Sequence, residues 1–227
     1  SIFVSSRFAP QLLGPISVAA YSYMSMVPVI QPPVIRALTT KEERRMNMTL
    51  RAGRTVSKRA RIFFPIVVTI VVGIFAPSSS TLIGFLMFGN LLRESGVVAR
   101  LSNSAQNELA NIVTIMLGLG ISCTMTGDRF LRADTLMILG MGLVAFVFDT
   151  AGGVLSAKLL NLFMKEKINP MIGAAGISAF PMSSRTIQQM AAREKTGTFV
   201  LMQASAANVA GQIGSVVAGG LLLALLG

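Results

Sequence analysis

Three uncharged polar side chains in the carboxy-terminal third of the chain are the first candidates for chemistry. Asn169 and Ser178 lie in the stretch Asn-Pro-Met-Ile-Gly-Ala-Ala-Gly-Ile-Ser-Ala-Phe-Pro-Met-Ser-Ser-Arg, residues 169–185, and Asn208 lies in the last apolar segment. Amide and hydroxyl oxygens, with carbonyls of unwound backbone, can coordinate sodium without a high charge cost. The alternative is that these side chains only join helices by hydrogen bonds.

The stretch 169–185 cannot be an ordinary membrane-spanning helix. Pro170, Gly173, Gly176 and Pro181 interrupt it and would unwind the backbone beside the polar side chains. Broken helices at membrane depth persist where the freed backbone groups line a cavity or bind an ion. We therefore expect the functional site on this broken segment.

Three further side chains have two interpretations each. Arg185 could hold a carboxylate in bidentate fashion, or anchor a helix end at the interface. Asp149, the one acid deep within a spanning segment, could mark an ion or proton path, or make a polar contact near a kink at Gly152-Gly153. Tyr23, like its neighbour Tyr21, could serve as proton donor or ion ligand at mid-membrane, or belong to an interfacial aromatic belt.

Composition predicts an all-α polytopic membrane protein with a single membrane domain over residues 1–227. The chain is 52% hydrophobic and 13% charged, with mean hydropathy +0.67. No charged residue occurs in the 28 positions from Phe8 to Ile35 or in the 32 from Thr196 to Gly227. Both runs exceed the ~20 residues that cross a bilayer.

The charge is concentrated in one loop, residues 36–61. This loop holds nine of the twenty Lys and Arg residues but only Glu42 and Glu43 as acids. The positive-inside rule places it in the cytoplasm, where contact with anionic lipid is expected. Nucleic-acid binding is not expected, because no aromatic residues interleave with these charges to stack on bases. Thr40 is suited to cap a short helix in the loop.

The pattern predicts several spans and half-spans. The expected segments are 9–35, interrupted by its five prolines, then 62–76, a re-entrant or half helix at 81–92, 109–125 after a polar hairpin at 93–108, 135–162, and the final span. A near-neutral turn at 128–134 fits the opposite side of the membrane. The final span carries small residues at Ala207, Gly211, Ser215 and Gly219, a face that lets another helix approach closely.

The residue inventory excludes some chemistry within these 227 residues. There is no histidine and a single cysteine, Cys123, so a disulfide framework, a thiolate zinc site and histidine acid–base catalysis are excluded, and no metal other than sodium is expected. The chain begins at Ser1 in an apolar context. We expect an amino-terminal part to be missing, and with it the partner half of an inverted-repeat, transporter-like architecture.

Long stretches of the sequence resemble the beta subunit of the sodium-translocating biotin-dependent decarboxylases. They include Ala-Tyr-Ser-Tyr-Met, Gln-Pro-Pro-Val, Arg-Ala-Leu-Thr-Thr-Lys-Glu-Glu-Arg, Gly-Asn-Leu-Leu-Arg-Glu-Ser-Gly-Val-Val, Lys-Ile-Asn-Pro-Met-Ile-Gly-Ala-Ala-Gly-Ile-Ser-Ala and Asn-Val-Ala-Gly. The resemblance is collinear over essentially the whole chain. It implies a membrane subunit that couples decarboxylation of carboxybiotin to export of sodium from the cell.

The resemblance also implies site residues. The family's functional positions fall on Tyr23, Asn169, Gly173, Ser178, Arg185 and Asn208. Sodium would bind at the asparagines, Gly173 and Ser178, Arg185 would orient the carboxybiotin, and Tyr23 and Ser178 would handle ions or the proton that decarboxylation consumes. Tyr23 is preferred to Tyr21 on this basis.

The family further implies partners and a location. These are a biotin carrier that supplies carboxybiotin, a carboxyltransferase subunit, a small membrane subunit and membrane lipid, in an oligomer in the inner (plasma) membrane. The partner carboxyltransferase sets the substrate: methylmalonyl-CoA, glutaconyl-CoA or oxaloacetate. Phe-Asp-Thr-Ala-Gly-Gly and Asn-Val-Ala-Gly-Gln-Ile are more similar to the acyl-CoA members.

Two departures from the family pattern qualify these expectations. The family's essential aspartate would lie just before Ser1, so we expect this stretch to be inactive alone. Gln203-Ala-Ser-Ala-Ala stands where the family often has His-Ala-x-Gly-Pro, which leaves no histidine role beside Asn208. The rival hypothesis is a sodium-coupled secondary carboxylate transporter without enzymatic chemistry, which would carry the same broken helices, oxygen ligands and arginine.

Overall fold

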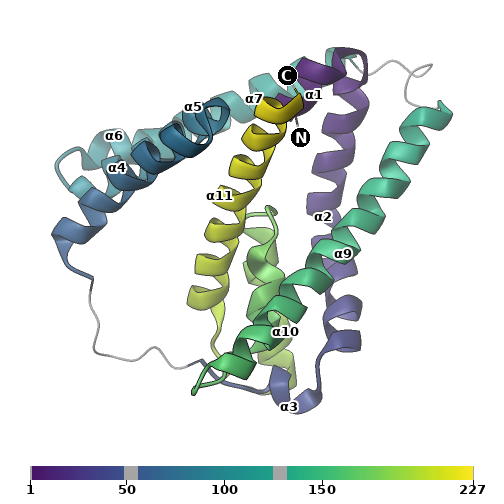
Figure 1. Cartoon of the computed structure of the whole chain (residues 1–227), viewed down its shortest axis with the longest axis vertical. Helices are drawn as coiled ribbons and strands as arrows, with labels where there is room; N and C mark the ends of the chain where they lie inside the picture. The colour runs from purple at the N-terminus through teal and green to yellow at the C-terminus, as the bar shows by residue number, and fades with distance from the viewer. Residues whose placement is uncertain (1, 49–55, 125–131, 227) are drawn as a thin grey trace. The chain divides into compact units, whose positions relative to one another are not determined.

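The computed structural model describes residues 2–48, 56–124 and 132–226, and every regular element in these ranges is helical (Figure 1). Three helical stretches are long and apolar enough to cross a membrane: Pro10–Leu38, Ala133–Phe163 and Leu201–Leu226. The all-α membrane class predicted from composition is therefore confirmed. Residues 49–55 of the basic loop and 128–131 of the near-neutral turn lie outside the described residues.

The chain forms two compact units. Unit 1 contains residues 1–14, 51–127 and 216–227, and unit 2 contains residues 15–50 and 128–215. The last helix, α11 (Leu201–Leu226), gives its first fifteen residues to unit 2 and the rest to unit 1. The prediction that all 227 residues make a single membrane domain stays a prediction.

Unit 1 is built around a helical hairpin. Its elements are α1 (Ile2–Phe8), η1 (Pro10–Leu12), α4 (Lys58–Phe75), η2 (Pro77–Ser79), α5 (Ser80–Ser95), α6 (Ala99–Ser104), η3 (Ala105–Leu109), α7 (Ala110–Thr124) and the end of α11. Helices α4 and α5 lie side by side (Figure 1). Because Pro77 has no amide hydrogen, it ends α4 and starts a single turn of η2 before α5. The short half helix expected at 81–92 is thus α5.

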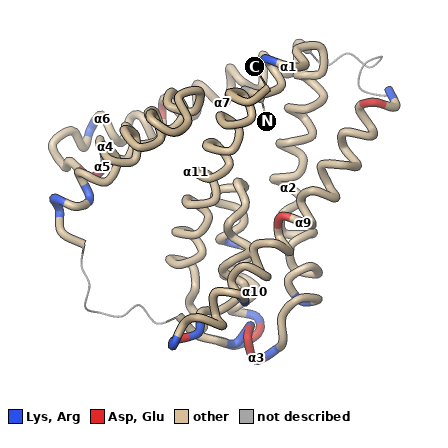
Figure 2. Tube along the Cα trace, in the orientation of Figure 1, with Lys and Arg blue, Asp and Glu red and all other residues tan. Residues whose placement is uncertain are grey.

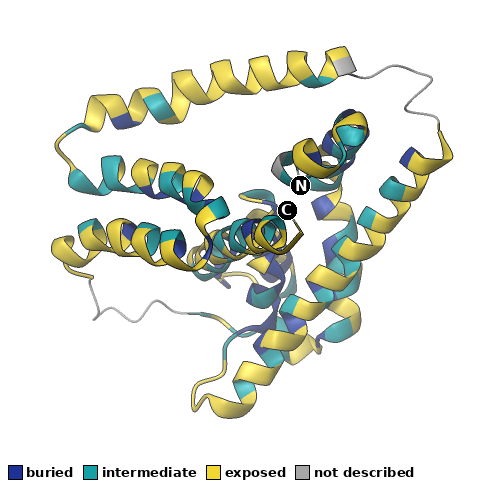
Figure 3. Ribbon diagram, turned by 45° about the horizontal axis from the view of Figure 1, so that its top comes forward, coloured by how far each residue is buried: buried dark blue, intermediate teal, exposed yellow. Residues whose placement is uncertain are grey.

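The polar hairpin expected at 93–108 is mostly helix. Helix α5 runs on to Ser95 and ends at Gly96, whose φ of 70° is the left-handed conformation that glycine adopts at helix ends. Helix resumes at Ala99 and continues into η3. In η3 the side-chain amides of Gln106 and Asn107 donate to backbone carbonyls one turn back. The two helical arms meet at Gly96, and side-chain bonds along the second arm let its polar residues form a helix. In α7 every residue from 110 to 120 is exposed (Figure 3), and Cys123 is exposed near its end.

The elements of unit 2 surround the broken segment. They are α2 (Leu13–Leu38), α3 (Lys41–Arg44), α9 (Ala133–Phe163), η4 (Pro170–Gly176), α10 (Met182–Glu194) and the first half of α11. The first span is interrupted only near its start, at η1, while α2 continues through Pro28, Pro32 and Pro33. Each internal proline removes one amide hydrogen, which leaves a carbonyl unpaired without ending the helix.

The core of unit 2 is centred on the broken segment itself. Buried residues of η4, among them Met171, Ala174 and Ala175, pack with Ile35 of α2 and Val154 of α9. Further members of this cluster come from α10, from α11 and from the residue that precedes α11: Ile187, Met190, Ala191, Ala204 and Val200. The part of the chain with the poorest helical pattern is therefore the best buried, a position that requires its polar backbone groups to find partners.

Candidate functional site

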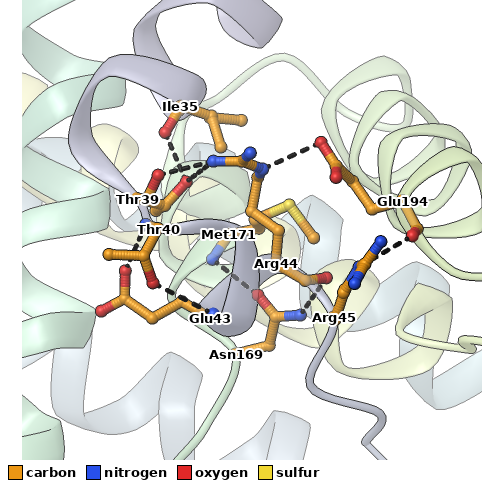
Figure 4. A network of polar contacts seen from close by, with 9 residues as sticks. All are labelled: Ile35, Thr39, Thr40, Glu43, Arg44, Arg45, Asn169, Met171 and Glu194. Carbon is orange, nitrogen blue, oxygen red and sulfur yellow. Dashed lines mark hydrogen bonds and ion pairs between the residues drawn. The ribbon is translucent and has the colours of Figure 1, made fainter.

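The broken segment begins at a fully buried asparagine. The Asn169 side chain is 0% exposed and caps η4, because its Oδ1 accepts a hydrogen bond from Met171 N at 3.1 Å. Its Nδ2 donates to Arg44 O at 3.3 Å (Figure 4) and to Met46 O at 2.9 Å. Both amide hydrogens are therefore used to attach the start of the broken segment to the end of α3 and to the residues that follow it. Only the oxygen keeps acceptor capacity for a ligand.

The end of α10 is attached to the same place. Arg44 Nε lies 2.9 Å from Glu194 Oε1, and the two side chains are only 12% and 15% exposed. The Arg44 guanidinium also donates to Thr39 O, and Arg45 Nε donates to Glu194 O at 3.2 Å (Figure 4). The short helix α3 thus holds both the start of η4 and the end of α10.

A third connection joins α3 to α9. Thr40 caps α3 as predicted, with Glu43 N donating to Thr40 Oγ1 at 3.3 Å and Thr40 N donating to Glu43 Oε2 at 2.7 Å. The same Oε2 lies 3.1 Å from Lys158 Nζ of α9. Burial raises the pKa of the Glu43 carboxyl, but the hydrogen bonds from Thr40 and Lys158 and the lysine charge lower it more, so its pKa lies below the ordinary value. Figure 2 shows charged residues gathered around α3 and the adjoining end of α10.

Glycines bring the backbone of η4 against helices on two sides. A Cβ added to Gly153 of α9 would lie 2.3 Å from Gly173 O, and one added to Gly173 would lie 2.1 Å from Gly153 O. A Cβ on Gly211 of α11 would lie 1.8 Å from Gly176 O. The close approach predicted from the small residues of the last helix is confirmed at Gly211. No side chain larger than hydrogen fits at these contacts.

The break itself spans residues 177–181, between η4 and α10, and its neighbouring carbonyls are bonded by side chains. Gln31 Nε2 donates to Ala174 O at 2.9 Å and Ser183 Oγ to the same oxygen at 3.2 Å, while Asn208 Nδ2 donates to Ile177 O at 2.7 Å. Sequence reasoning missed Gln31 and Ser183. The available signal was Gln31 itself, an amide within a run of 28 uncharged residues, where a polar group needs a partner.

One buried acceptor beside the break has no partner. Asn208 is 0% exposed, and while its Nδ2 is bonded, its Oδ1 has no hydrogen-bond partner among the residues that the structure describes. Leaving a buried carbonyl oxygen unpaired costs about 1–3 kcal/mol, so such an atom calls for a ligand. A neutral amide oxygen next to unwound backbone suits a hard monovalent cation.

The remaining predicted residues lie in different places. Ser178, within the break, and Arg185, in the first turn of α10, are exposed, and the Arg185 guanidinium has no hydrogen bond or ion pair with any described residue. Asp149 is exposed on α9, one turn before Gly153. Asn169, Gly173 and Ser178 lie along the broken segment, Asn208 contacts that segment from α11 at Ile177 O, and Arg185 lies in the first turn of α10.

Tyr23 is held away from the break. Its hydroxyl donates to Leu139 O of α9, and its ring occupies the place that a side chain on Gly142 would take. Gly142 lies eleven residues before Gly153, which is about 16 Å along a helix. Tyr23 and the broken segment thus contact α9 at two separate levels.

Comparison with known proteins gives consistent matches over the whole chain. The family model described as Na+-transporting oxaloacetate decarboxylase beta subunit matches residues 1–226. The chain is 52% identical to the methylmalonyl-CoA decarboxylase subunit beta of Propionigenium modestum over 227 residues, which is 100% of this chain and 57% of the relative.

Relatives with other names are equally similar. The oxaloacetate decarboxylase beta chain of Klebsiella pneumoniae is 51% identical over 98% of this chain and 51% of its own. The glutaconyl-CoA decarboxylase subunit beta of Acidaminococcus fermentans is 51% identical over 100% of this chain and 60% of its own. The chain spans just over half the length of these relatives, and the identities do not separate acyl-CoA members from oxaloacetate members.

Proposed function

The chain belongs to the family of Na+-transporting oxaloacetate decarboxylase beta subunits, and on that premise we propose that it acts in the membrane subunit of a decarboxylase sodium pump. The full-length subunit would couple decarboxylation of carboxybiotin to export of sodium ions. The observation that carries the proposal is the unpaired Oδ1 of buried Asn208 beside a helix break.

The proposed sodium site lies on the broken segment. Its ligands are the oxygens of Asn208 and Asn169, the Ser178 hydroxyl and the backbone at Gly173. Support comes from their common place on or beside η4, from the absence of charged side chains among them, and from the free acceptor capacity of both asparagine oxygens. Asp149, one turn before the Gly153 contact, is proposed to lie on the ion or proton path.

Arg185 is proposed to orient the carboxylate of carboxybiotin. Its exposure and free guanidinium leave it able to form a bidentate pair with a substrate carboxylate. On decarboxylation the bond between the ureido nitrogen and the carboxylate carbon breaks, carbon dioxide leaves, and the nitrogen takes up a proton. Ser178 and Tyr23 are proposed to handle that proton or the ions, Ser178 beside the substrate and Tyr23 at its separate level on α9.

The complex and its location follow from the same proposal. A biotin carrier would deliver carboxybiotin from a carboxyltransferase subunit, with a small membrane subunit completing an oligomer in the inner membrane. The basic loop 36–61 is proposed to face the cytoplasm, in contact with anionic lipid, since it holds nine of the twenty Lys and Arg residues.

The test uses the full-length subunit, reconstituted into vesicles with its biotin-bearing partners. Radioactive sodium uptake is followed during decarboxylation, with and without avidin, for wild type, Asn208→Ala, Asn169→Ala and the exposed control Asn107→Ala. Avidin-sensitive uptake lost in the first two variants and kept in the control is expected. Uptake that ignores avidin and follows a carboxylate gradient would instead identify a sodium-coupled carboxylate transporter.

A further inference from the structure

A closed polar network ties α2 to both sides of the helix break. Gln31 Nε2 donates to Ala174 O and to Ser183 Oγ, each at 2.9 Å, and Ser183 Oγ lies 3.0 Å from Gln31 Oε1. All three residues are fully buried at 0% exposure. Ala174 is in η4, before the break, and Ser183 is in α10, after it.

Donors and acceptors in this network are matched. The two hydrogens of Gln31 Nε2 go to Ala174 O and Ser183 Oγ, and the single Ser183 hydrogen goes to Gln31 Oε1 at 3.0 Å or Ala174 O at 3.2 Å. In an apolar core a fully satisfied network of this kind fixes geometry more strictly than hydrophobic packing does. The loop from Ala174 to Ser183 is therefore closed on itself and anchored to α2.

The anchored loop contains the candidate site. Ser178 lies inside it, Arg185 is two residues beyond its end, and Ile177 O receives Asn208 Nδ2 from α11 at 2.7 Å. Gln31 from α2 and Asn208 from α11 thus hold carbonyls on either side of Gly176. Of the two amide oxygens, Gln31 Oε1 lies 3.0 Å from the Ser183 hydroxyl, whereas Asn208 Oδ1 has no partner among the described residues.

We propose that Gln31 is a positioning residue for sodium, which with Ser183 fixes the loop 174–183 so that its oxygens and the Asn208 oxygen face a common point. Gln31 does not itself bind the ion. The inference rests on the proposed sodium pump and adds to it a residue on α2 that sets the affinity of the site. Without the network, the ion's binding energy would also have to order the loop.

The test measures decarboxylation against sodium concentration in the full-length complex. Gln31→Met keeps the volume and removes every hydrogen bond. We expect the half-saturating sodium concentration to rise about tenfold, the equivalent of one net hydrogen bond, while the maximal rate at saturating sodium stays within about threefold. Ser183→Ala should raise it about threefold, because Gln31 still donates to Ala174 O.

The control is a second glutamine–serine pair, in unit 1, which does not contain the break. Gln106 Nε2 donates to Ser102 O at 3.1 Å and to Ser102 Oγ at 3.0 Å within one helical turn of unit 1, so Gln106→Met should leave the sodium dependence unchanged. An unchanged half-saturating sodium concentration in Gln31→Met, or a lower maximal rate alone, would overturn the proposal.

Ser183→Ala decides the question if Gln31→Met does not assemble. An unshifted sodium dependence in Ser183→Ala then overturns the positioning role. A wild-type complex whose decarboxylation ignores sodium would instead overturn the proposed function, which distinguishes the two failures.

Discussion

Each unit of the chain contains an interrupted helix, and the two interruptions are held in different ways. In unit 1 the interruption is at Ala76–Ser79, where Ser79 Oγ donates to Val216 O of α11 at 2.8 Å. In unit 2 it is at residues 177–181, where the amide of Asn208 from α11 donates to Ile177 O and the amide of Gln31 donates to Ala174 O. A glycine of α11 makes the close contact in both units, Gly220 with Ser79 and Gly211 with Gly176.

The two interruptions differ in whether a buried polar atom beside them is left without a hydrogen-bond partner. At the unit 1 interruption the Ser79 hydroxyl donates to a carbonyl of α11, and none of the described residues there has a buried side-chain polar atom without a partner. At the unit 2 interruption amides donate inward to the broken backbone, and an amide has an oxygen as well as a nitrogen, which leaves Asn208 Oδ1 free. A broken helix becomes a candidate ion site when its partners bring oxygens that the fold does not use.

The largest expected effect is a loss of stability, and it should differ between the glycine contacts of α11 at Gly211 and Gly220. Gly211→Ala places a methyl group 1.8 Å from the backbone oxygen of Gly176, which cannot rotate away, so we expect a loss of about 3 kcal/mol in the free energy of unfolding and loss of sodium-dependent decarboxylation. In Gly220→Ala the nearest atom, at 1.6 Å, is the rotatable Ser79 Oγ, and the atoms that stay in place, Ser79 Cβ and Ser79 N, lie farther away, at 2.7 and 2.9 Å. We expect about half the loss of stability there.

Thermal unfolding of the purified full-length complex measures both variants. Gly214→Ala, which has nothing within 4 Å of the new Cβ, is the matched control and should behave as wild type. If Gly220→Ala proved as damaging as Gly211→Ala, the distinction between a rigid and an adaptable contact would fail.

A second expectation compares the ion pair of each unit. Glu194→Gln leaves the largely buried Arg44 without its charge partner, and we expect a loss of about 3 kcal/mol, because both side chains are at most 15% exposed. Glu94→Gln breaks the Arg61–Glu94 pair of the unit 1 hairpin, whose side chains are 51% and 24% exposed, and should cost less than about 0.5 kcal/mol. Denaturation at two salt concentrations checks this, since added salt should weaken only the exposed pair.

The third expectation concerns sodium directly. Asn208→Leu removes the unpaired oxygen and the bond to Ile177 O, so the half-saturating sodium concentration should rise at least about tenfold. Ser79→Ala removes the corresponding bond in unit 1 and should lower stability by about 1 kcal/mol with no change in sodium dependence. Sodium titrations of decarboxylation distinguish the two. Equal shifts in both variants would mean that either interruption contributes to ion binding.

The smallest effect depends on pH and belongs to unit 2 alone. Because the pKa of Glu43 in the folded protein is below its ordinary value of 4.5, the ionised carboxyl stabilises the fold above that pH, and this contribution is lost as the pH falls through the folded pKa. The unfolding temperature of wild type should exceed that of Glu43→Gln at pH 7, and the gap should narrow below about pH 4.5. A gap that stays constant down to pH 3 would argue against the carboxylate as the cause.

Much of the fold could be predicted, because a long apolar segment without charged residues indicates a membrane-spanning helix. The charge-free runs at 8–35 and 196–227 correctly predicted the long helices α2 and α11. The prolines and glycines of 169–185 correctly predicted an interruption between helices. The continuity of α2 through three prolines could not be predicted, because packing can hold a helix together that has lost single hydrogen bonds. The helical form of residues 99–108 was missed because side-chain bonds along a helix leave no apolar pattern.

The sequence indicated which residues form the candidate site, but it did not indicate most of their hydrogen-bond partners. Asn169, Ser178 and Asn208 were found because polar groups are rare in such segments. Gln31 and Ser183 were missed because their bonds join residues about 150 positions apart, which no local pattern records. For the same reason the sequence could not indicate that both amide hydrogens of Asn169 are used in attaching the break to α3, or that Tyr23 contacts α9 at another level.

The lone thiol near the end of α7 offers a direct way to orient the subunit. Cys123 is the only cysteine in these 227 residues, and its side chain is exposed. A charged maleimide that cannot cross lipid, added first outside sealed vesicles and then after they are opened, reports which compartment this end of α7 faces. Because no native cysteine in this region competes, single substitutions in the basic loop can be labelled against Cys123→Ser, and the two results together fix which way the chain is threaded.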